Sequence, residues 1–168
     1  MILLAAVDRK GAIGKDNRLI YRVPEDLKNF RKLTTGNVVV MGRKTLESFP
    51  DGKPLPNRLN VVLSSRYENT EGYDNLLVAR GALDLFTLLE QHSEGKTVYL
   101  CGGESVYKAF CGACDGAILT EIDAEAADAD AFFPPLLPED GWQVVETTEW
   151  ETSVSGLRYR FVTLKKET

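Results

Sequence analysis

The feature that most constrains the fold is the alternation of short apolar runs with amphipathic stretches over the first two thirds of the chain. The apolar runs predict strands at residues 2–7, 37–42, 58–64, 75–79, 96–102 and 116–122. The stretches between them predict helices at residues 25–33, 43–49, 82–92 and 104–110. Apolar strands separated by helices indicate an α/β fold. We therefore expect a mostly parallel central sheet flanked by about four helices.

The last third of the chain has a different pattern. Residues 142–150 and 157–165 alternate apolar and polar side chains, and "SVSG" (153–156) lies between them. This pattern predicts a C-terminal antiparallel hairpin that completes the sheet. Residues 8–24 and the proline-rich "FFPPLLP" (132–138) are expected to be loops. No linker-like composition, repeat or low-complexity tract interrupts the sequence, so we predict a single domain over residues 1–168.

Composition and charge exclude several classes of partner. The chain is 43% hydrophobic and 27% charged, which is ordinary for a soluble globular protein. Its net charge of −5 argues against general affinity for nucleic acid or an anionic membrane, although a local basic site remains compatible with it. The apolar run at residues 2–7 has no basic segment before it and fits a buried strand better than a signal peptide or a membrane span. We expect a cytoplasmic protein.

The cysteines do not form a convincing motif. Cys111 and Cys114 follow a predicted helix and precede a predicted strand, which is the reverse of the order around a thioredoxin-like pair. A zinc site would need more ligands, and the chain offers only Cys101 and His92 in addition. A turn of small residues with reduced thiols is the simpler interpretation, and no metal site is expected.

Three segments that follow predicted strands can each bind an anion. They are "MGRKT" (41–45), "LSSR" (63–66) and "LCGGESVY" (100–107). The first and third combine glycine with a helix start, the first also carries two cations, and the second supplies hydroxyls and a guanidinium. Each alone could be a solvated helix start or a tight turn. Because ligands of open α/β sheets bind beyond the carboxyl ends of the strands, together they indicate a nucleotide with several phosphates.

The segment "RVPEDLKNF" (22–30) places an acid where an apolar residue is expected. Pro24 suits the first position of a helix, and Glu25 is favourable in the first turn because of the helix dipole. Asp26, however, shares the helical spacing of Phe30 and Leu33, so it lies on or beside the apolar face. Helix-end electrostatics alone could explain both acids, but an inward-facing carboxylate also suits a ligand contact.

Two further segments remain open on the residues alone. The long loop 8–24 is either a binding loop or a plain surface loop. "PLPNR" (54–58) ends in Arg58, which could hold a carboxylate through two hydrogen bonds, although a surface arginine is the commoner case.

Taken in order, seven motifs resemble those of chromosomal-type bacterial dihydrofolate reductases. They are "AIGKDNRL", "VPEDLKNF", "VVMGRKTLES", "PLPNR", "NVVLSS", "CGGESVY" and "LTEIDAE". The resemblance implies hydride transfer from NADPH to C6 of 7,8-dihydrofolate with water-assisted protonation at N5, giving 5,6,7,8-tetrahydrofolate for one-carbon metabolism. It also implies binding of antifolate inhibitors and a monomeric state.

The resemblance also assigns roles to residues. It implies that Asp26 hydrogen-bonds N3 and the 2-amino group of the pterin, with Thr120 supporting it and Tyr21 beside it. The implied contacts to the substrate are Leu4, Ala6, Leu27, Phe30, Phe49, Leu55 and, for the α-carboxylate of the glutamate tail, Arg58. The implied cofactor contacts are Ala6, Ile13, Gly14, Asn17, Leu19, Gly42, Arg43, Lys44, Thr45, Leu63, Ser64, Ser65, Arg66, Cys101, Gly102, Gly103, Glu104, Ser105, Val106 and Tyr107. Arg43, Lys44, Thr45 and 64–66 would include the 2′-phosphate pocket, and the family joins the glycine pair by a cis peptide bond.

The chain departs from the family pattern at two places. Ile20-Tyr21 stands where the family usually has Pro-Trp, so the water that the tryptophan helps to hold needs another arrangement. Ser105 replaces an arginine or glutamine near the pyrophosphate. Two rival functions stay open: a related reductase that acts on a ribosylated pyrimidine in riboflavin synthesis, and a nucleotide-binding module without catalysis.

Overall fold

A nine-stranded sheet forms the centre of the protein in the computed structural model, which describes residues 1–67 and 72–167. Along its main path the strand order is β10-β12-β8-β1-β7-β4-β5-β6, and the short β11 pairs with β12. Six neighbouring strands are parallel: β8 (Gly116–Ile122), β1 (Ile2–Val7), β7 (Val98–Leu100), β4 (Val38–Gly42), β5 (Leu59–Leu63) and β6 (Leu76–Ala79). The remaining members are β10 (Trp142–Thr147), β11 (Glu151–Thr152) and β12 (Arg158–Lys166), and their mutual pairings and that of β12 with β8 are antiparallel.

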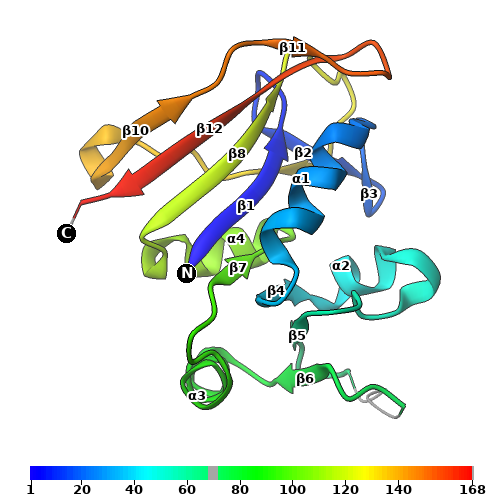
Figure 1. Ribbon diagram of the computed structural model, residues 1–168, viewed down its shortest axis with the longest axis vertical. Helices are drawn as coiled ribbons and strands as arrows, with labels where there is room; N and C mark the ends of the chain where they lie inside the picture. The colour runs from blue at the N-terminus through cyan, green and yellow to red at the C-terminus, as the bar shows by residue number, and fades with distance from the viewer. Residues whose placement is uncertain (68–71, 168) are drawn as a thin grey trace.

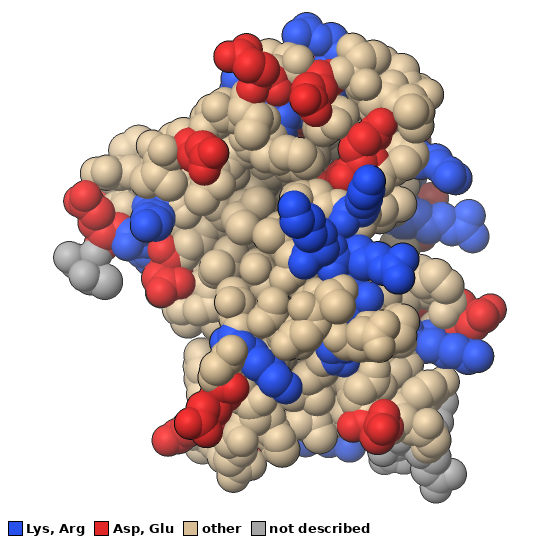
Figure 2. Space-filling view, viewed as in Figure 1, with Lys and Arg blue, Asp and Glu red and all other residues tan. Residues whose placement is uncertain are grey.

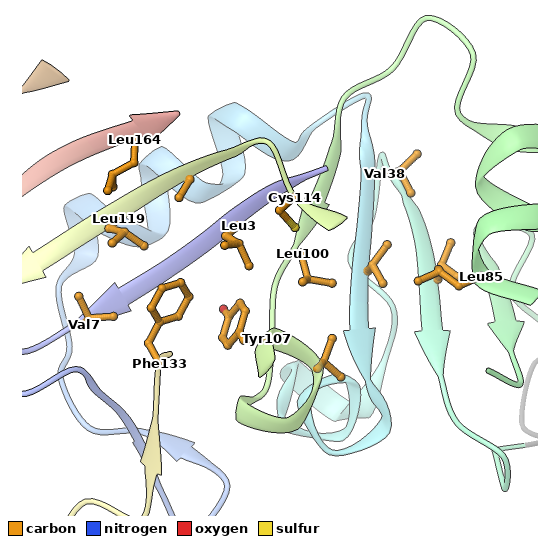
Figure 3. Close-up of a cluster of buried hydrophobic side chains, with 14 of the residues drawn as sticks. Leu3, Val7, Val38, Leu85, Leu100, Tyr107, Cys114, Leu119, Phe133 and Leu164 are labelled. Carbon is orange, nitrogen blue, oxygen red and sulfur yellow. The ribbon is translucent and has the colours of Figure 1, made fainter. Parts of the chain in front are cut away.

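Helices cover both faces of this sheet, as Figure 1 shows. On one face α1 (Pro24–Thr34) and α2 (Arg43–Ser48) pack against the core cluster that contains Leu4, Val39 and Met41. On the other face α3 (Ala82–His92) and α4 (Glu104–Phe110) pack against the cluster around Leu3 and Leu100, which Figure 3 shows in close-up. Successive strand residues point to opposite faces, so the continuous apolar strands fill both layers.

The predicted fold class is confirmed, including the four helices and the C-terminal antiparallel region. The prediction that residues 8–24 form only a loop is wrong, because β2 (Ala12–Lys15) and β3 (Arg18–Leu19) lie within them. These strands form a second sheet with β9 (Ala131–Phe132), whose last residue falls in the segment that we expected to be a proline-rich loop. The pairing joins segments more than a hundred positions apart, so local patterns give little sign of it.

Shorter features also differ from the prediction. The strand expected at 142–150 is shorter in the structure: β10 ends at Thr147, after an irregularity in its pairing between Val144 and Glu146. Three turns of 3₁₀ helix, η1 (Pro50–Gly52), η2 (Cys111–Ala113) and η3 (Pro138–Asp140), were not anticipated.

The cysteines are unpaired. Cys101, Cys111 and Cys114 are free thiols, and burial raises the pKa of Cys114 to about 11. The "CGAC" segment is a 3₁₀ turn after α4, in agreement with the simpler interpretation above. Among residues 1–67 and 72–167, no helix has both the length and the apolar character needed to cross a membrane.

Candidate active site

A cavity of about 1000 Å³ opens at the carboxyl ends of the parallel strands. The segments that follow β4, β5 and β7 all contribute to its wall, so the three predicted anion-binding segments do converge. Every residue that the resemblance assigns to the cofactor lines this cavity. The wall also contains residues that were not singled out: Ala5, Lys15, Asp16, Arg18, Ser48, Asp130 and Ala131. Its volume lies at the upper end of the range of small-molecule sites, ~300–1000 Å³.

Two glycines allow α4 to pack closely against the ends of β4 and β7. Gly102 has φ of +110°, and a Cβ atom there would lie 3.1 Å from the ring of Tyr107. A Cβ atom on Gly42 would lie 3.1 Å from Cγ2 of Val106. The backbone N–H of Gly42 donates to the carbonyl of Gly102 over 2.8 Å, and the bond between Gly102 and Gly103 is cis, as the resemblance implies. A side chain at either glycine would therefore push α4 away from the strand ends.

The polar part of the cavity wall is organised around Ser64. Its hydroxyl accepts hydrogen bonds from the backbone N–H groups of Arg66 and Tyr67, each over 3.1 Å. Arg80 donates from Nη1 to the carbonyl of Ser64 over 3.3 Å, and the sequence analysis did not identify this residue. Arg43 forms an ion pair with Glu47 at 2.8 Å one turn along α2. These contacts fix the backbone of residues 64–67, and Arg43, Lys44 and Arg66 bring positive charge to the cavity wall.

A second cavity of about 200 Å³ lies beside Asp26. It shares Ala6, Ile13 and Leu19 with the larger cavity, so the two are contiguous. Leu27 lines it and is 50% exposed, which shows that this apolar side chain faces the cavity and not the core. The sequence predicted that Asp26 lies on or beside the apolar face of its helix. Its position at a small, partly apolar pocket is consistent with this prediction.

Asp26 accepts a hydrogen bond from the hydroxyl of Thr120 on β8. Burial raises the pKa of the Asp26 carboxyl, and the hydrogen bond from Thr120 lowers it only in part, so the pKa stays above its ordinary value. Glu25, its neighbour, points elsewhere: it accepts from the hydroxyl of Ser153 over 2.6 Å and from the N–H of Val154 over 2.9 Å. The two adjacent acids therefore differ in their surroundings. Asp26 lies at the pocket, whereas Glu25 joins α1 to the turn at residues 153–156.

Tyr21 also lines the small cavity, but its hydroxyl points to another carboxylate. It donates to Asp8 at the end of β1 over 2.9 Å. Burial and this hydrogen bond raise the pKa of Tyr21 to about 12. The ring therefore forms part of the pocket wall while the hydroxyl is engaged with Asp8, which the sequence analysis did not identify.

Arg58 is buried, so the alternative of a surface arginine is wrong. It donates from Nε to the carbonyl of Pro56 over 2.8 Å and from Nη1 to the hydroxyl of Thr34 over 2.9 Å. The buried Asn60 exchanges two hydrogen bonds with the backbone of Leu55, at 2.9 and 3.0 Å, and so fixes the "PLPNR" turn. These contacts hold the guanidinium in one orientation.

The other expected substrate residues lie close to α1. Phe30 and Phe49 are partly buried and pack against the cluster that contains Leu4. Neither cavity wall includes Leu4, Phe30, Phe49, Leu55, Arg58 or Thr120. Figure 2 shows basic side chains gathered over the region of α1, where Lys28, Arg31 and Lys32 are exposed. This local charge contrasts with the net charge of −5 and favours an anionic ligand here.

No group of three or more metal-ligating side chains occurs within the parts of the chain that the structure describes. The fold and the two contiguous cavities define an α/β protein that can take a phosphorylated nucleotide beside a smaller, partly apolar ligand with hydrogen-bond donors.

Comparison with known proteins identifies the family. The family model described as dihydrofolate reductase matches residues 1–166. A dihydrofolate reductase of Mycobacterium leprae (strain TN) is 39% identical over 164 residues, 94% of this chain and 93% of the relative. One of Staphylococcus aureus (strain Mu50 / ATCC 700699) is 39% identical over 148 residues, 88% of this chain and 85% of the relative. The chain belongs to the dihydrofolate reductase family, whose members reduce dihydrofolate to tetrahydrofolate and generally use NADPH.

Proposed function

We propose that this protein reduces 7,8-dihydrofolate to 5,6,7,8-tetrahydrofolate with NADPH, and that Asp26 orients the pterin ring. The observation that carries the proposal is the Asp26–Thr120 pair at a pocket contiguous with a large, cation-lined cavity. When bound, NADPH would supply the hydride that is transferred to C6 of the pterin. The remaining tasks, which are binding, orientation and exclusion of water, fall to the protein.

The larger cavity fits the cofactor by its donors. Arg43, Lys44 and Arg66 supply positive charge, and Ser64 and Ser65 line the same wall. Such a set suits a ligand with a pyrophosphate and a further phosphate monoester. We propose that the segment 64–66 with Arg43 binds the 2′-phosphate and thereby selects NADPH over NADH.

Asp26 is suited to recognise one edge of a pterin. A buried carboxylate is unfavourable unless it meets hydrogen-bond donors, and Thr120 supplies only one. N3 and the 2-amino group of a pterin would offer two more donors, side by side, which match the two oxygens of a carboxylate. A carboxylate engaged at that edge raises the basicity of the ring and leaves N5 out of its direct reach, so we propose that water delivers the proton.

The region of α1 supports a substrate that carries its own carboxylate. Arg58 already has two of its donors fixed by Pro56 and Thr34, and no hydrogen bond of its other terminal nitrogen occurs within the described residues. Exposed Lys28 and Arg31 add positive charge on this helix. We propose that Arg58 binds the α-carboxylate of the folate tail, that antifolates with a similar ring edge compete for Asp26, and that the protein acts as a cytoplasmic monomer.

The substitution Asp26→Asn tests the assignment. We expect NADPH affinity to stay within about threefold and reduction of dihydrofolate at neutral pH to slow by about 10²- to 10⁴-fold. Asp115→Asn is the matched control, because that carboxylate is 79% exposed and pairs with the N-terminal amine away from both cavities. Near-normal turnover by Asp26→Asn would contradict the proposal.

A direct assay separates the rival functions. We expect the absorbance of NADPH to fall only when dihydrofolate is added, and not with a ribosylated pyrimidine. Binding of NADPH without any reduction would instead indicate a nucleotide-binding module.

A further inference from the structure

A network of hydrogen bonds and ion pairs at the carboxyl ends of β1 and β8 has no part in the function proposed so far. Its centre is Asp8, whose side chain is 5% exposed although it carries a carboxylate. Oδ1 accepts from the backbone N–H groups of Lys10 and Ala12, each over 2.9 Å. Oδ2 accepts from the hydroxyl of Tyr21 and the N–H of Ala126, also at 2.9 Å. Four donors thus surround one buried carboxylate.

These four donors come from three separate segments. Lys10 and Ala12 begin the loop that follows β1, Tyr21 stands near the end of the same loop, and Ala126 follows β8. Burial raises the pKa of Asp8, but the bonds from Ala126, Ala12, Lys10 and Tyr21 together outweigh it and leave the pKa below its ordinary value. Asp8 is therefore a stable anion that holds both ends of one loop and a neighbouring segment together.

Further contacts strengthen the junction between the first loop and the segment after β8. The N–H of Arg9 donates to the carbonyl of Ala124 over 3.1 Å, and its guanidinium pairs with Asp123. Lys10 lies 3.7 Å from Glu125. Within the loop, Asp8, Ala12 and Val23 are buried, whereas residues 16–19 are exposed. The loop is therefore held by buried residues at its ends, whereas its middle is exposed and is bonded through Asp16 and Asn17 to Asp130 and Lys44.

The residues between the fixed ends form walls of both cavities. Ile13 and Leu19 line the large cavity and the pocket beside Asp26. They lie on the small sheet of β3, β2 and β9, in which β3 and β9 have only two residues each. The placement of both cavity walls thus depends on where the two ends of the loop are attached as well as on the pairing of β2 with β9.

We propose that Asp8 is a positioning residue, and that its buried carboxylate, through Tyr21, Ala12 and Ala126, fixes the loop that walls the cofactor and substrate cavities. The kinetic part of the proposal rests on the proposed function, whereas the anchoring itself does not.

The test compares two tyrosines with the same chemistry. Tyr21→Phe removes the bond to Asp8 and keeps the ring in the pocket wall. Tyr159→Phe is the matched control: its hydroxyl donates to Glu151 over 2.9 Å, and the pKa of Tyr159 is likewise raised to about 12, by burial and this bond. Asp8→Asn is the stronger variant, because the NH₂ group of the new amide is a donor and would face another donor, the N–H of Ala126 or of Ala12.

The first readout is amide hydrogen exchange of the ligand-free protein. We expect Ala12 and Ala126 to exchange faster in Tyr21→Phe by about tenfold, the effect of losing one bond to a charged group. Tyr159→Phe should leave both rates unchanged. The second readout is the Kd for NADPH. We expect it to rise by at least about threefold in Tyr21→Phe and to stay unchanged in Tyr159→Phe, because part of the free energy of one hydrogen bond to a charged group is lost from cofactor binding.

The third readout is steady-state kinetics with dihydrofolate. We expect kcat/KM to fall by about tenfold in Tyr21→Phe and about a hundredfold in Asp8→Asn, with Tyr159→Phe like the wild type. Wild-type exchange rates or an unchanged Kd in Tyr21→Phe would overturn the proposal, as would equal kinetic effects in the two tyrosine variants. Failure of the wild type to reduce dihydrofolate would overturn only the proposed function, because exchange and NADPH affinity still decide the role of Asp8. If Asp8→Asn does not fold, Tyr21→Phe carries the test.

Discussion

The bond from Thr120 to Asp26 gives the sharpest test of how the pocket controls its acid. Thr120 lies on β8 opposite Ala6 of β1, and its hydroxyl donates to Oδ1 of Asp26. Burial alone raises the pKa of that carboxyl, and the Thr120 hydroxyl is the contact that opposes the rise. Thr120→Val removes the donor and keeps the branched shape of the side chain, so the carboxylate loses stabilisation while packing changes little.

The size of the effect follows from the energy of one hydrogen bond. A hydrogen bond to a charged group contributes ~1.5–3 kcal/mol, and 1.36 kcal/mol corresponds to about one pH unit. We therefore expect the limb of the kcat/KM profile that titrates Asp26 to move to higher pH by about 1–2 units in Thr120→Val. The profile is measured with NADPH saturating and dihydrofolate limiting, so that it reports the pKa values of the enzyme before the substrate binds.

Thr163→Val serves as the control for this prediction. Thr163 lies on the neighbouring strand β12, opposite Ile118, and no side-chain hydrogen bond of this residue occurs within the described part of the chain. The same chemical change should leave the profile of Thr163→Val where the wild type has it. If Thr120→Val also shows the wild-type profile, the hydroxyl does not tune Asp26 and the reasoning is refuted.

Three further changes test the cavity, the core and the α1 contact. Arg66→Ala should lower the kcat/KM ratio of NADPH to NADH by about 10- to 100-fold through loss of one charged contact, and an unchanged ratio would exclude Arg66 from the 2′-phosphate pocket. Leu46→Ala, at a side chain with no exposure, should lower the free energy of unfolding in urea by ~2–5 kcal/mol. Leu83→Ala, at 82% exposure, should change it by less than ~0.5 kcal/mol, and similar losses in the two would contradict the assigned core. The hydrogen bonds from Ser153 and Val154 lower the pKa of Glu25 in the folded protein. The ionised Glu25 carboxylate therefore stabilises the folded state at pH values above its unfolded pKa of about 4.3, and this stabilisation is lost as the pH falls through its folded pKa. Glu25→Gln should therefore be less stable than the wild type at pH 7, and the deficit should shrink as the pH falls through the folded pKa, so a deficit that does not shrink in acid would exclude this carboxylate as its source.

The sheet and the larger cavity could be predicted because their causes are local. Each parallel strand is an apolar run bounded by helix signals, and the carboxyl ends of parallel strands meet at one edge of the sheet. The segments 41–45, 63–66 and 100–107 therefore had to converge once the strands were assigned. Asp26 could be predicted to face inward because helical periodicity fixes its direction relative to Phe30.

Contacts that join distant segments could not be predicted in this way. Nothing near Glu25 in the sequence indicates Ser153, 128 positions away, and helix-dipole reasoning offered a sufficient local explanation. The residues alone left Arg58 open between a carboxylate-binding and a surface arginine, because the contact that shows its burial is with Thr34, 24 positions earlier. Asp8 next to Arg9 and Lys10 resembles any charged turn, and its burial depends on Ala126 reaching it from the next strand.

Asp26 shows how function limits stability in this fold. Because burial raises its folded pKa above the unfolded value, the native state binds the proton more tightly, and stability falls as pH rises from the unfolded value through the folded one. At pH values above that window, the ligand-free protein carries an ionised carboxylate at a position where a neutral side chain would be less unfavourable. Thr120 offsets this destabilisation only in part. Under the proposed function, a ligand that brings two donors to the same carboxylate would offset more of it, and this gain would contribute to the affinity and orientation of a pterin-like edge.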